Sequence, residues 1–194
     1  MGWNDEWSDC KVAGDVGRFE NNVYKAKSAV TDIGSYVDEI GTLGTGNDQF
    51  DAPFDITNDG TYLYICDYYN HRIKKHKCSD LSYVDEIGTR GTGNDQFDYP
   101  HGITNDGTYL YICDRYNNRI KKHKCSDLSY VGEIGTEGTG NNQFSLPHGI
   151  TNDGTYLYIC DMSNRRIKKR YITDPPDDAP THWQKLTGGF TCNF

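Results

Sequence analysis

Short runs of alternating apolar and polar residues recur along the chain, and turn-forming residues separate them. The segment "TYLYICD" at 61–67 is rich in β-branched and aromatic residues, which is typical of a β-strand. The Asp-Gly pair just before it, at 59–60, predicts a tight hairpin because both residues tolerate a positive φ. No stretch of useful length has the 3.6-residue apolar period of a helix. The pattern therefore predicts an all-β protein.

The same series of segments returns every 47 residues. Residues 44–90 and 91–137 differ at only seven positions, and a third copy runs from Gly138 to Asp174. Each copy predicts four short strands, which in the first copy are "FDIT", "TYLYICD", "RIKKHK" and "SYVDEIGT". Four antiparallel strands at a period in the forties correspond to one β-propeller blade. We therefore expect about three blades of four antiparallel strands per chain, over residues 35–174.

The repeats are out of phase with whole blades. Residues 35–42, "SYVDEIGT", have the sequence of a fourth strand whose blade is missing. Upstream, "NNVYKAK" at 21–27 resembles a third strand whose sequence has diverged. We therefore expect residues 1–34 to be an N-terminal segment with a degenerate partial blade. The third copy ends after its third strand, which leaves residues 175–194 as a C-terminal tail.

Three blades make half of a six-bladed ring, and a half ring would expose two blade faces and a sheet edge. A two-fold pair of chains would complete the ring, with the N-terminal strand of each chain closing the last blade of its partner. We therefore expect a homodimer. Two alternatives stay open, namely that the C-terminal "THWQKLTGGF" supplies the missing strand or that the chain is a fragment of a longer array.

The spaced motif of the copies resembles the NHL repeat. It reads Phe-x-x-Pro-x-Gly-Ile, Asp-Gly, Tyr-x-Tyr-Ile-x-Asp and Asn-x-Arg-Ile, and "NHRI" at 70–73 retains the Asn-His of that family's signature. The resemblance covers about residues 35–174. It implies propeller blades, usually six to a ring, and a role in binding or assembly.

Differences between the first two copies gather at one end of the predicted blades. Six of the seven lie on or beside the connections that follow the second and fourth strands, whereas the opposite turns "TNDGT" and "KCSDLS" are unchanged. We call the variable end the top face. Without selection, the loops at both ends should vary in sequence to the same extent. Because only the top loops vary, we expect the top face to recognise a protein, glycan or other ligand. The candidate ligand-binding residues are Phe54, Tyr68, His71, Tyr99, His101, Arg115, Asn118, His148 and Arg165.

His101 and His148 begin the innermost strands of successive blades, and we expect them to point toward the propeller channel. "PHG" at both positions also resembles the NHL-type lyase domain that completes peptide amidation, in which channel His residues hold zinc. That resemblance would make the two residues metal ligands in a metal-dependent enzyme. However, Phe54 replaces the first His, and a catalytic zinc needs three protein ligands. We therefore favour a binding or assembly module without a cofactor over a zinc enzyme.

The cysteines do not follow a disulfide or metal pattern. Cys66, Cys113 and Cys160 each follow "YLYI", and we expect them to be small core residues with free thiols. The position one period after Cys125 is Ile172, and a half-buried apolar position tolerates such an exchange better than a disulfide does. Metal-type CxxC pairs are absent.

Two sets of charged residues also repeat. Asp67 and Arg72 recur in every copy, and we expect a charge-assisted bond that ties the second strand to the third. The lysines of "RIKKHK" form a basic band in each copy, and we expect their amines to reach solvent.

Net charge and apolar content limit the partners. The formal charge of −8 makes nucleic acid and anionic membranes unsuitable partners for the whole molecule. The longest apolar run, "YLYIC", is too short to span a membrane. The N-terminal "MGWNDEWSDC" is acidic and no apolar segment of a signal peptide follows it. An intracellular setting, a virion setting and another route of export stay open.

Overall fold

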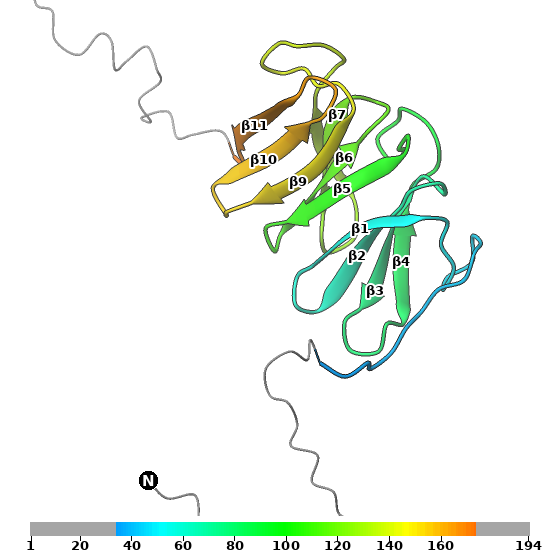
Figure 1. The fold of residues 1–194 in the computed structure, drawn as a ribbon. Coiled ribbons are helices and arrows are strands. Elements are labelled where there is room, and N and C mark those ends of the chain that lie inside the picture. Colours follow the sequence, from blue (N-terminus) through cyan, green and yellow to red (C-terminus); the bar gives the residue numbers. More distant parts are fainter. Residues whose placement is uncertain (1–33, 174–194) are drawn as a thin grey trace, which may run out of the picture. The chain divides into compact units, whose positions relative to one another are not determined.

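The computed structural model describes residues 34–173, and every regular element within them is a β-strand (Figure 1). The predicted partial blade at 21–27 and the predicted tail from residue 175 lie outside the described residues. In the described part of the chain, no helix is long and apolar enough to cross a membrane. The prediction of an all-β protein is confirmed.

The strands of residues 34–173 form three antiparallel sheets in which neighbours follow one another in sequence. The first blade holds β1 (Pro53–Asn58), β2 (Tyr62–Asp67), β3 (Arg72–Lys77) and β4 (Tyr83–Ile87). The second blade holds β5 (Pro100–Asn105), β6 (Tyr109–Asp114), β7 (Arg119–Lys124) and β8 (Tyr130–Ile134). The third blade holds β9 (Pro147–Asn152), β10 (Tyr156–Asp161) and β11 (Arg166–Tyr171). Sheets in this up-and-down order are β-propeller blades, as predicted.

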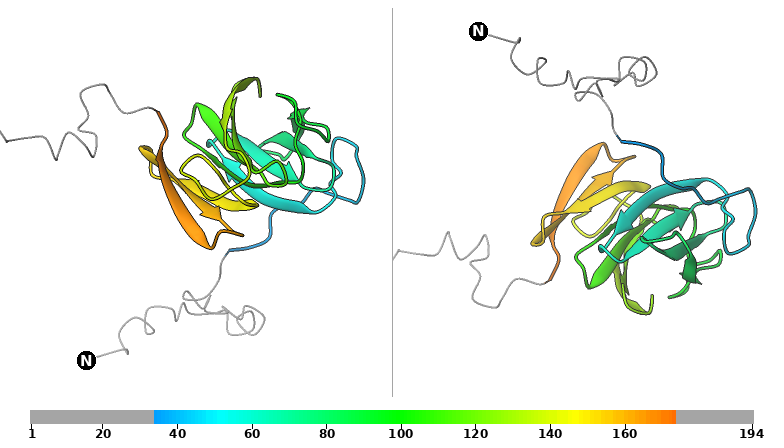
Figure 2. Two further views of the ribbon diagram at one scale, coloured as in Figure 1. Left: turned by 90° about the horizontal axis from the view of Figure 1, so that it is seen from above. Right: turned by 90° about the horizontal axis from the view of Figure 1, so that it is seen from below.

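The blades stack face to face, with their first strands side by side. β5 contacts β1 on one side and β9 on the other (Figure 2). One apolar core lies between the first and second blades, and a second lies between the second and third blades. We call the side of a blade that packs on the next blade its front face, and the opposite side its back face. The front face of the first blade contributes Tyr64, Cys66 and Ile73, and the back face of the second contributes Ile103, Leu110 and Ile112.

The two junctions differ at the second residue after the proline of the first strand. In the first blade this residue is Asp55, and its Oδ2 accepts a hydrogen bond from the backbone N–H of Ile103 at 2.9 Å. In the second blade it is Gly102, where a Cβ atom would lie 2.3 Å from the carbonyl oxygen of His148. Glycine therefore allows β5 and β9 an approach that a residue with a side chain would prevent.

Residues 35–42 do not form the strand that their sequence predicts. They repeat the sequence of β4 and its flanks, yet no residue from 34 to 42 belongs to a strand, and Tyr36 and Val37 are exposed. β4 pairs with β3 of its own sheet. In the described residues no third strand precedes the segment 35–42, whereas β4 follows a third strand with which it pairs.

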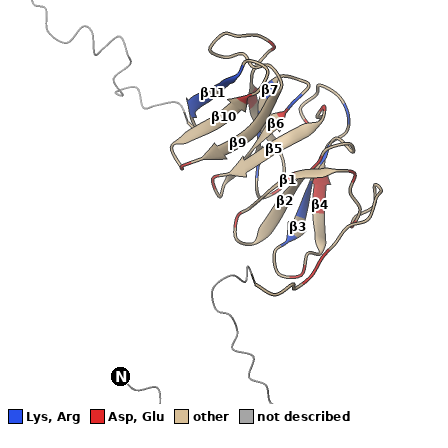
Figure 3. Ribbon diagram, in the orientation of Figure 1, with Lys and Arg blue, Asp and Glu red and all other residues tan. Residues whose placement is uncertain are grey.

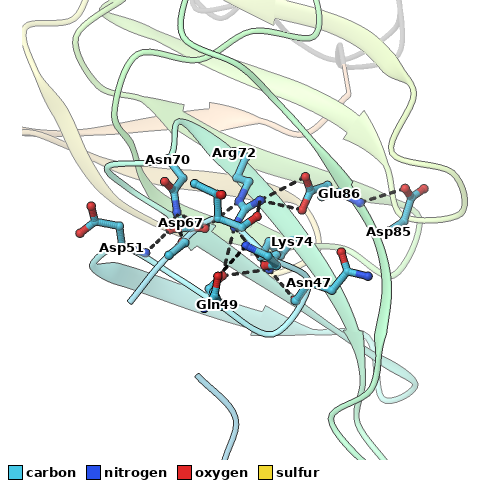
Figure 4. Close-up of polar contacts among 12 residues, drawn as sticks. Asn47, Gln49, Asp51, Asp67, Asn70, Arg72, Lys74, Asp85 and Glu86 are labelled. Atoms are coloured by element: carbon cyan, nitrogen blue, oxygen red, sulfur yellow. Dashed lines mark hydrogen bonds and ion pairs between the residues drawn. The ribbon is translucent and has the colours of Figure 1, made fainter. Parts of the chain in front are cut away.

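The recurring Asp and Arg tie the second strand to the third, which confirms the prediction (Figure 4). Arg72 Nε donates to Asp67 Oδ2 at 2.7 Å, and both side chains are buried. Arg72 Nη1 also donates to Glu86 of β4 at 3.0 Å and to the carbonyl of Thr45 at 2.7 Å. One guanidinium thus joins three strands to the preceding loop. The equivalent 2.7 Å pairs are Asp114–Arg119 and Asp161–Arg166.

The lysines of the third strand do not all reach solvent, and this prediction is wrong for Lys74, Lys75 and Lys121. Lys74 is fully buried. Its Nζ donates to three carbonyls of the preceding Gly-rich loop, those of Gly46, Asn47 and Gln49. Lys121 repeats these bonds, and burial lowers its pKa to about 8, which leaves the ammonium charged at pH 7. Carbonyl oxygens replace the water that the charge loses.

Cys66 and Cys113 lie in the two cores as free thiols, as predicted. Cys160 is also a free thiol but is exposed, contrary to the prediction of a core position. The reason is its place on the front face of the third blade, on which no further blade of the described residues packs.

Candidate functional site

The top-face turns hold their backbone in the left-handed region at non-glycine residues. His71, Asn118 and Arg165 each follow a second strand and have φ values of 54°, 55° and 55°. Asn and His are enriched in this region relative to most residues. The turn therefore has the same backbone conformation in each blade, and the residues just before it occupy equivalent positions in the three blades.

His71 and Asn118 also join each blade to the next. The backbone N–H of Tyr99 donates to His71 Nδ1 at 3.1 Å, and the N–H of Leu146 donates to Asn118 Oδ1 at 2.9 Å. His and Asn differ in shape, but each offers an acceptor at this point. The variation between copies therefore preserves a hydrogen bond across the junction. Arg165, the third residue of the series, has no acceptor atom in its side chain.

Aromatic rings from the first two blades meet around Tyr68, whose side chain is buried. Its ring centroid lies 5.0 Å from Phe54 and 4.8 Å from Tyr99. Tyr69 lies 5.0 Å from Tyr68, and Tyr116 lies 5.0 Å from Tyr99. We call these five residues the aromatic patch. The rings of Phe54, Tyr69 and Tyr116 are about half exposed, so the patch has a buried centre and an accessible surface.

A stack of three rings continues the patch along the first strands of the blades. The centroid of Phe54 lies 3.8 Å from His101, and the centroid of His101 lies 3.5 Å from His148. His101 is buried, whereas Phe54 is exposed at the end of the stack. The equivalent positions of the three blades therefore lie side by side, as predicted. In the first blade the position holds the phenyl ring of Phe54 and not an imidazole.

Arg115 lies against two residues of the aromatic patch. Its Nη1 donates to the hydroxyl of Tyr68 at 2.9 Å, and its Cζ lies 5.2 Å from the ring centroid of Tyr116. The buried Nε has no acceptor among the described residues. The guanidinium is thus held by one hydrogen bond and one ring contact, and the residue as a whole is half-buried.

The electrostatics of the site keep its histidines neutral at pH 7. Burial, together with the nearby His148 and Arg115, lowers the pKa of His101 to about 4. Burial also lowers the pKa of His148 and of His71. A neutral imidazole is the form that binds a metal ion. Charge therefore does not prevent ligation by His101 and His148.

The number of ligands, however, does not fit a catalytic zinc. Among residues 34–173, no group of three His, Cys, Asp or Glu side chains is arranged to hold a metal ion. Phe54 fills the third position of the stack. A catalytic zinc site uses three protein ligands and one open position. The described residues therefore do not supply the three ligands of such a site, and no reaction step through a metal follows from them.

The structure brings together seven of the nine predicted ligand-binding residues. Phe54, Tyr68 and Tyr99 belong to the aromatic patch, and His101 and His148 belong to the stack. Arg115 donates to Tyr68, and His71 contacts Tyr99 with ring centroids 4.4 Å apart. Asn118 lies at the junction with the third blade, and Arg165 is exposed beside His148 at a hollow of about 430 Å³ on the front face of the third blade.

Sequence reasoning missed two members of the aromatic patch, Tyr69 and Tyr116. They occupy the same position in the first two copies and therefore do not appear among the differences between copies. The third copy has Ser163 there. Comparison of all three copies, with attention to aromatic residues in top-face turns, would have found them.

No protein-family model and no curated protein matches the chain. Among solved structures, a Bacteroides fragilis protein described as exported matches 62% of the chain at 18% identity with a TM-score of 0.49. An auxiliary nutrient binding protein of Bacteroides thetaiotaomicron matches 59% at 20% identity with a TM-score of 0.45. Streptogramin B lyase matches 63% at 21% identity with a TM-score of 0.44. The matches cover 33%, 36% and 41% of those proteins, so the chain spans well under half of each. The assignment to β-propeller blades rests on the chain's own three sheets.

Proposed function

We propose that this chain is a β-propeller binding module that recognises a peptide segment of a partner protein through its top face. The observation that carries the proposal is the aromatic patch. Its five rings come from two blades, form a continuous series of ring contacts and leave Phe54, Tyr69 and Tyr116 about half exposed. Several large rings exposed side by side are typical of a surface that a ligand covers.

The chemistry of the patch suits a peptide. Tyrosine combines an apolar ring with a hydroxyl group, and Tyr and Arg are enriched among the residues that dominate protein interfaces. Arg115 supplies a planar donor next to Tyr116. The resemblance of the repeats to NHL blades also supports a binding role, although fold alone does not determine function.

A peptide selection tests this proposal. A phage-displayed library of random peptides is selected on the wild-type chain, and enriched peptides are titrated by fluorescence anisotropy. The double substitution Tyr69→Ala with Tyr116→Ala should weaken binding about 30-fold, which corresponds to a hot-spot loss of about 2 kcal/mol. Both side chains are about half exposed, so the fold should tolerate the change.

The matched control is Lys77→Ala with Lys124→Ala, two exposed residues at the opposite end of the same two blades. This variant should bind the selected peptides as the wild type does. Peptides that bind all three proteins equally would overturn the top-face assignment. Failure to select any peptide, with glycan-array binding that the tyrosine substitutions abolish, would replace the peptide by a carbohydrate.

A further inference from the structure

The exposure of equivalent residues follows the position of their blade in the stack. On the front faces, Ile73 and Ile120 are 0% and 2% exposed, whereas Ile167 of the third blade is 66% exposed. The same holds for thiols, because Cys66 and Cys113 are buried and Cys160 is exposed. The third blade therefore presents the apolar surface that the first two blades bury against their neighbours.

In the part of the chain that the structure describes, no blade packs on the back face of the first blade, which is the complementary surface. Ile56 is 54% exposed there, whereas the equivalent Ile103 of the second blade is 3% exposed. Cys78 is exposed, and the equivalent Cys125 is buried. A hollow of about 340 Å³ lies on this face, beside Glu39 and Ile40, and its apolar lining includes Phe50, Ile56, Leu63, Ile65 and Leu81. Equivalents of these five apolar residues line the core between the first and second blades.

Hydrogen bonds join the first blade to the second, and residues equivalent to their donors and acceptors lie on the front face of the third blade and on the first blade. Lys75 Nζ donates to the carbonyls of Cys125 and Ser126 at 2.8 and 2.9 Å, and the Tyr64 hydroxyl donates to Cys125 O at 3.0 Å. Two periods after these donors stand Lys169 and Tyr158, on the front face of the third blade. One period before the acceptors stand Cys78 and Ser79, on the first blade.

An asparagine ladder provides a second polar match. Asn105 Nδ2 donates to Asn58 O, and Asn152 Nδ2 donates to Asn105 O, both at 2.9 Å. The next bond of this series would run from the side chain of Asn58 to the carbonyl of Asn152. Those two groups lie on opposite ends of the described stack, so the bond needs a second molecule.

The open edge of β11 matches a strand sequence elsewhere in the chain. Figure 3 shows β3 lined by basic residues beside an acidic β4, whereas β11 is basic and is the last strand of its sheet. Residues 36–40 have the same sequence, YVDEI, as β4. Arg72 and Arg119 pair with Glu86 and Glu133 of their fourth strands. By the same register, Arg166 would pair with position 39, which is glutamate.

The segment that follows residues 36–40 already has the geometry found after β4. The backbone N–H of Phe50 donates to Thr42 O at 2.9 Å, and the N–H of Phe97 donates to Thr89 O at 3.0 Å. Parallel bridges join Leu43 to Phe50 and Arg90 to Phe97. Residues 42–50 are therefore folded as though a fourth strand of another blade preceded them.

We propose that two copies of this chain associate front to back. The front face of the third blade in one copy packs on the back face of the first blade in the other, and residues 36–40 of that other copy add to β11 as its fourth strand. Both ends of each chain take part, so two identical junctions form. Phe54 lines the hollow on the back face of the first blade, so this association would also cover part of the aromatic patch, whereas Tyr69 and Tyr116, the residues changed in the peptide test, do not line that hollow.

Mass measurement tests the association first. Light scattering of the full 194-residue chain at micromolar concentration should give about 44 kDa, twice the chain mass of 22.0 kDa. Ile167→Asp and Ile56→Asp alter exposed residues of the single chain, and each should shift the mass to one chain. Val131→Asp is the control, because Val131 is also exposed but lies on the outermost strand β8. A wild-type mass of one chain at all concentrations would overturn the proposal.

Mixing the two variants distinguishes a front-to-back contact from a symmetric one. A pair of Ile167→Asp and Ile56→Asp chains contains one junction with neither substitution, so the mixture should regain a complex that neither variant forms alone. If Ile56→Asp abolishes association while Ile167→Asp has no effect, then two back faces meet, and the proposal fails. Far-UV circular dichroism of each variant checks that its strands are intact.

Thiol chemistry tests the same contacts and the added strand. Cys78 and Cys160 should resist iodoacetamide in the wild type and react in Ile167→Asp, with buried Cys125 and Cys113 as internal controls. β3 and β4 pair Ile73 with Ile87, which corresponds to Ile167 of one copy and Ile40 of the other. Because Cys160 pairs with residue 167 across β10 and β11, the test uses a Cys160→Ser background, in which Ile40→Cys with Ile167→Cys should form a disulfide between chains on oxidation. A disulfide within one chain, or closure of β11 by residues 175–194, would overturn the strand exchange.

Discussion

The second and third blades share most of their sequence but have different surroundings. The second blade packs on a neighbour at each face, and its four strands include β8 with Glu133. The third blade packs on one neighbour and has three strands in the described residues. The comparison shows that, in a stack of repeats, burial depends on the neighbours of a residue as much as on its identity. The same isoleucine is core in one blade and surface in the next.

The largest expected effect is a difference in the free energy of unfolding that is lost when equivalent isoleucines of the two blades are shortened. Ile120→Ala removes buried atoms from a packed core and should lower the free energy of unfolding by about 2–5 kcal/mol. Ile167→Ala should lower it by less than about 1 kcal/mol, because that side chain is largely exposed in one chain. Urea denaturation in the Ile56→Asp background measures both. Equal losses would show that the third blade has a covered front face within the single chain.

A pH titration should distinguish the stacked histidines of the same two blades. The pKa of His101 is about 4 when folded, below the value of about 6.5 for an unfolded chain. Between these values the unfolded state binds the extra proton, so stability falls as pH decreases from about 6.5 to about 4, by at most about 3 kcal/mol.

His101→Phe should remove most of this pH dependence, and Phe54 shows that a phenyl ring fits the equivalent position. His148→Phe should remove less, because His148 is more exposed. Denaturation curves between pH 4 and pH 7 compare the two variants. An unchanged slope in His101→Phe would assign the pH dependence to another group.

A smaller effect should come from the outer carboxylates. Glu133→Gln removes the charge that Arg119 holds at 2.9 Å, and because that carboxylate is partly exposed the expected loss is about 1 kcal/mol of unfolding free energy. Glu86→Gln should behave alike in the first blade. Glu39→Gln should instead weaken association of two chains several-fold, as measured by sedimentation equilibrium. A wild-type dissociation constant for that variant would contradict the pairing of position 39 with Arg166.

The repeat made most of the fold predictable. Strand β3 has the bounds of "RIKKHK", and the bond between Asp67 and Arg72 follows from their fixed spacing across one turn. Both features depend on residues close in sequence. Alternation and turn chemistry are sufficient to locate such contacts.

Features that depend on distant groups were not predictable in the same way. Lys74 is buried because three carbonyl groups of residues 46–49 point at its ammonium, and a pattern of side chains does not reveal the direction of carbonyls. Residues 35–42 have the sequence of a strand, but a strand also requires an edge on which to pair. The exposure of Ile167 likewise depends on a neighbour that the pattern does not specify.

The close approach at Gly102 bears on how a stack of blades closes. Each junction turns one blade relative to the last, and the sum of these rotations decides whether a front-to-back series returns to its starting point or winds on as an open spiral. Gly102 allows β5 and β9 a spacing that a side chain would widen, whereas Asp55 sets the preceding junction through a hydrogen bond. One small residue on an inner strand therefore tunes the arc that each chain spans. In the proposed front-to-back association, a substitution such as Gly102→Val would change that arc and should favour a filament over a closed ring.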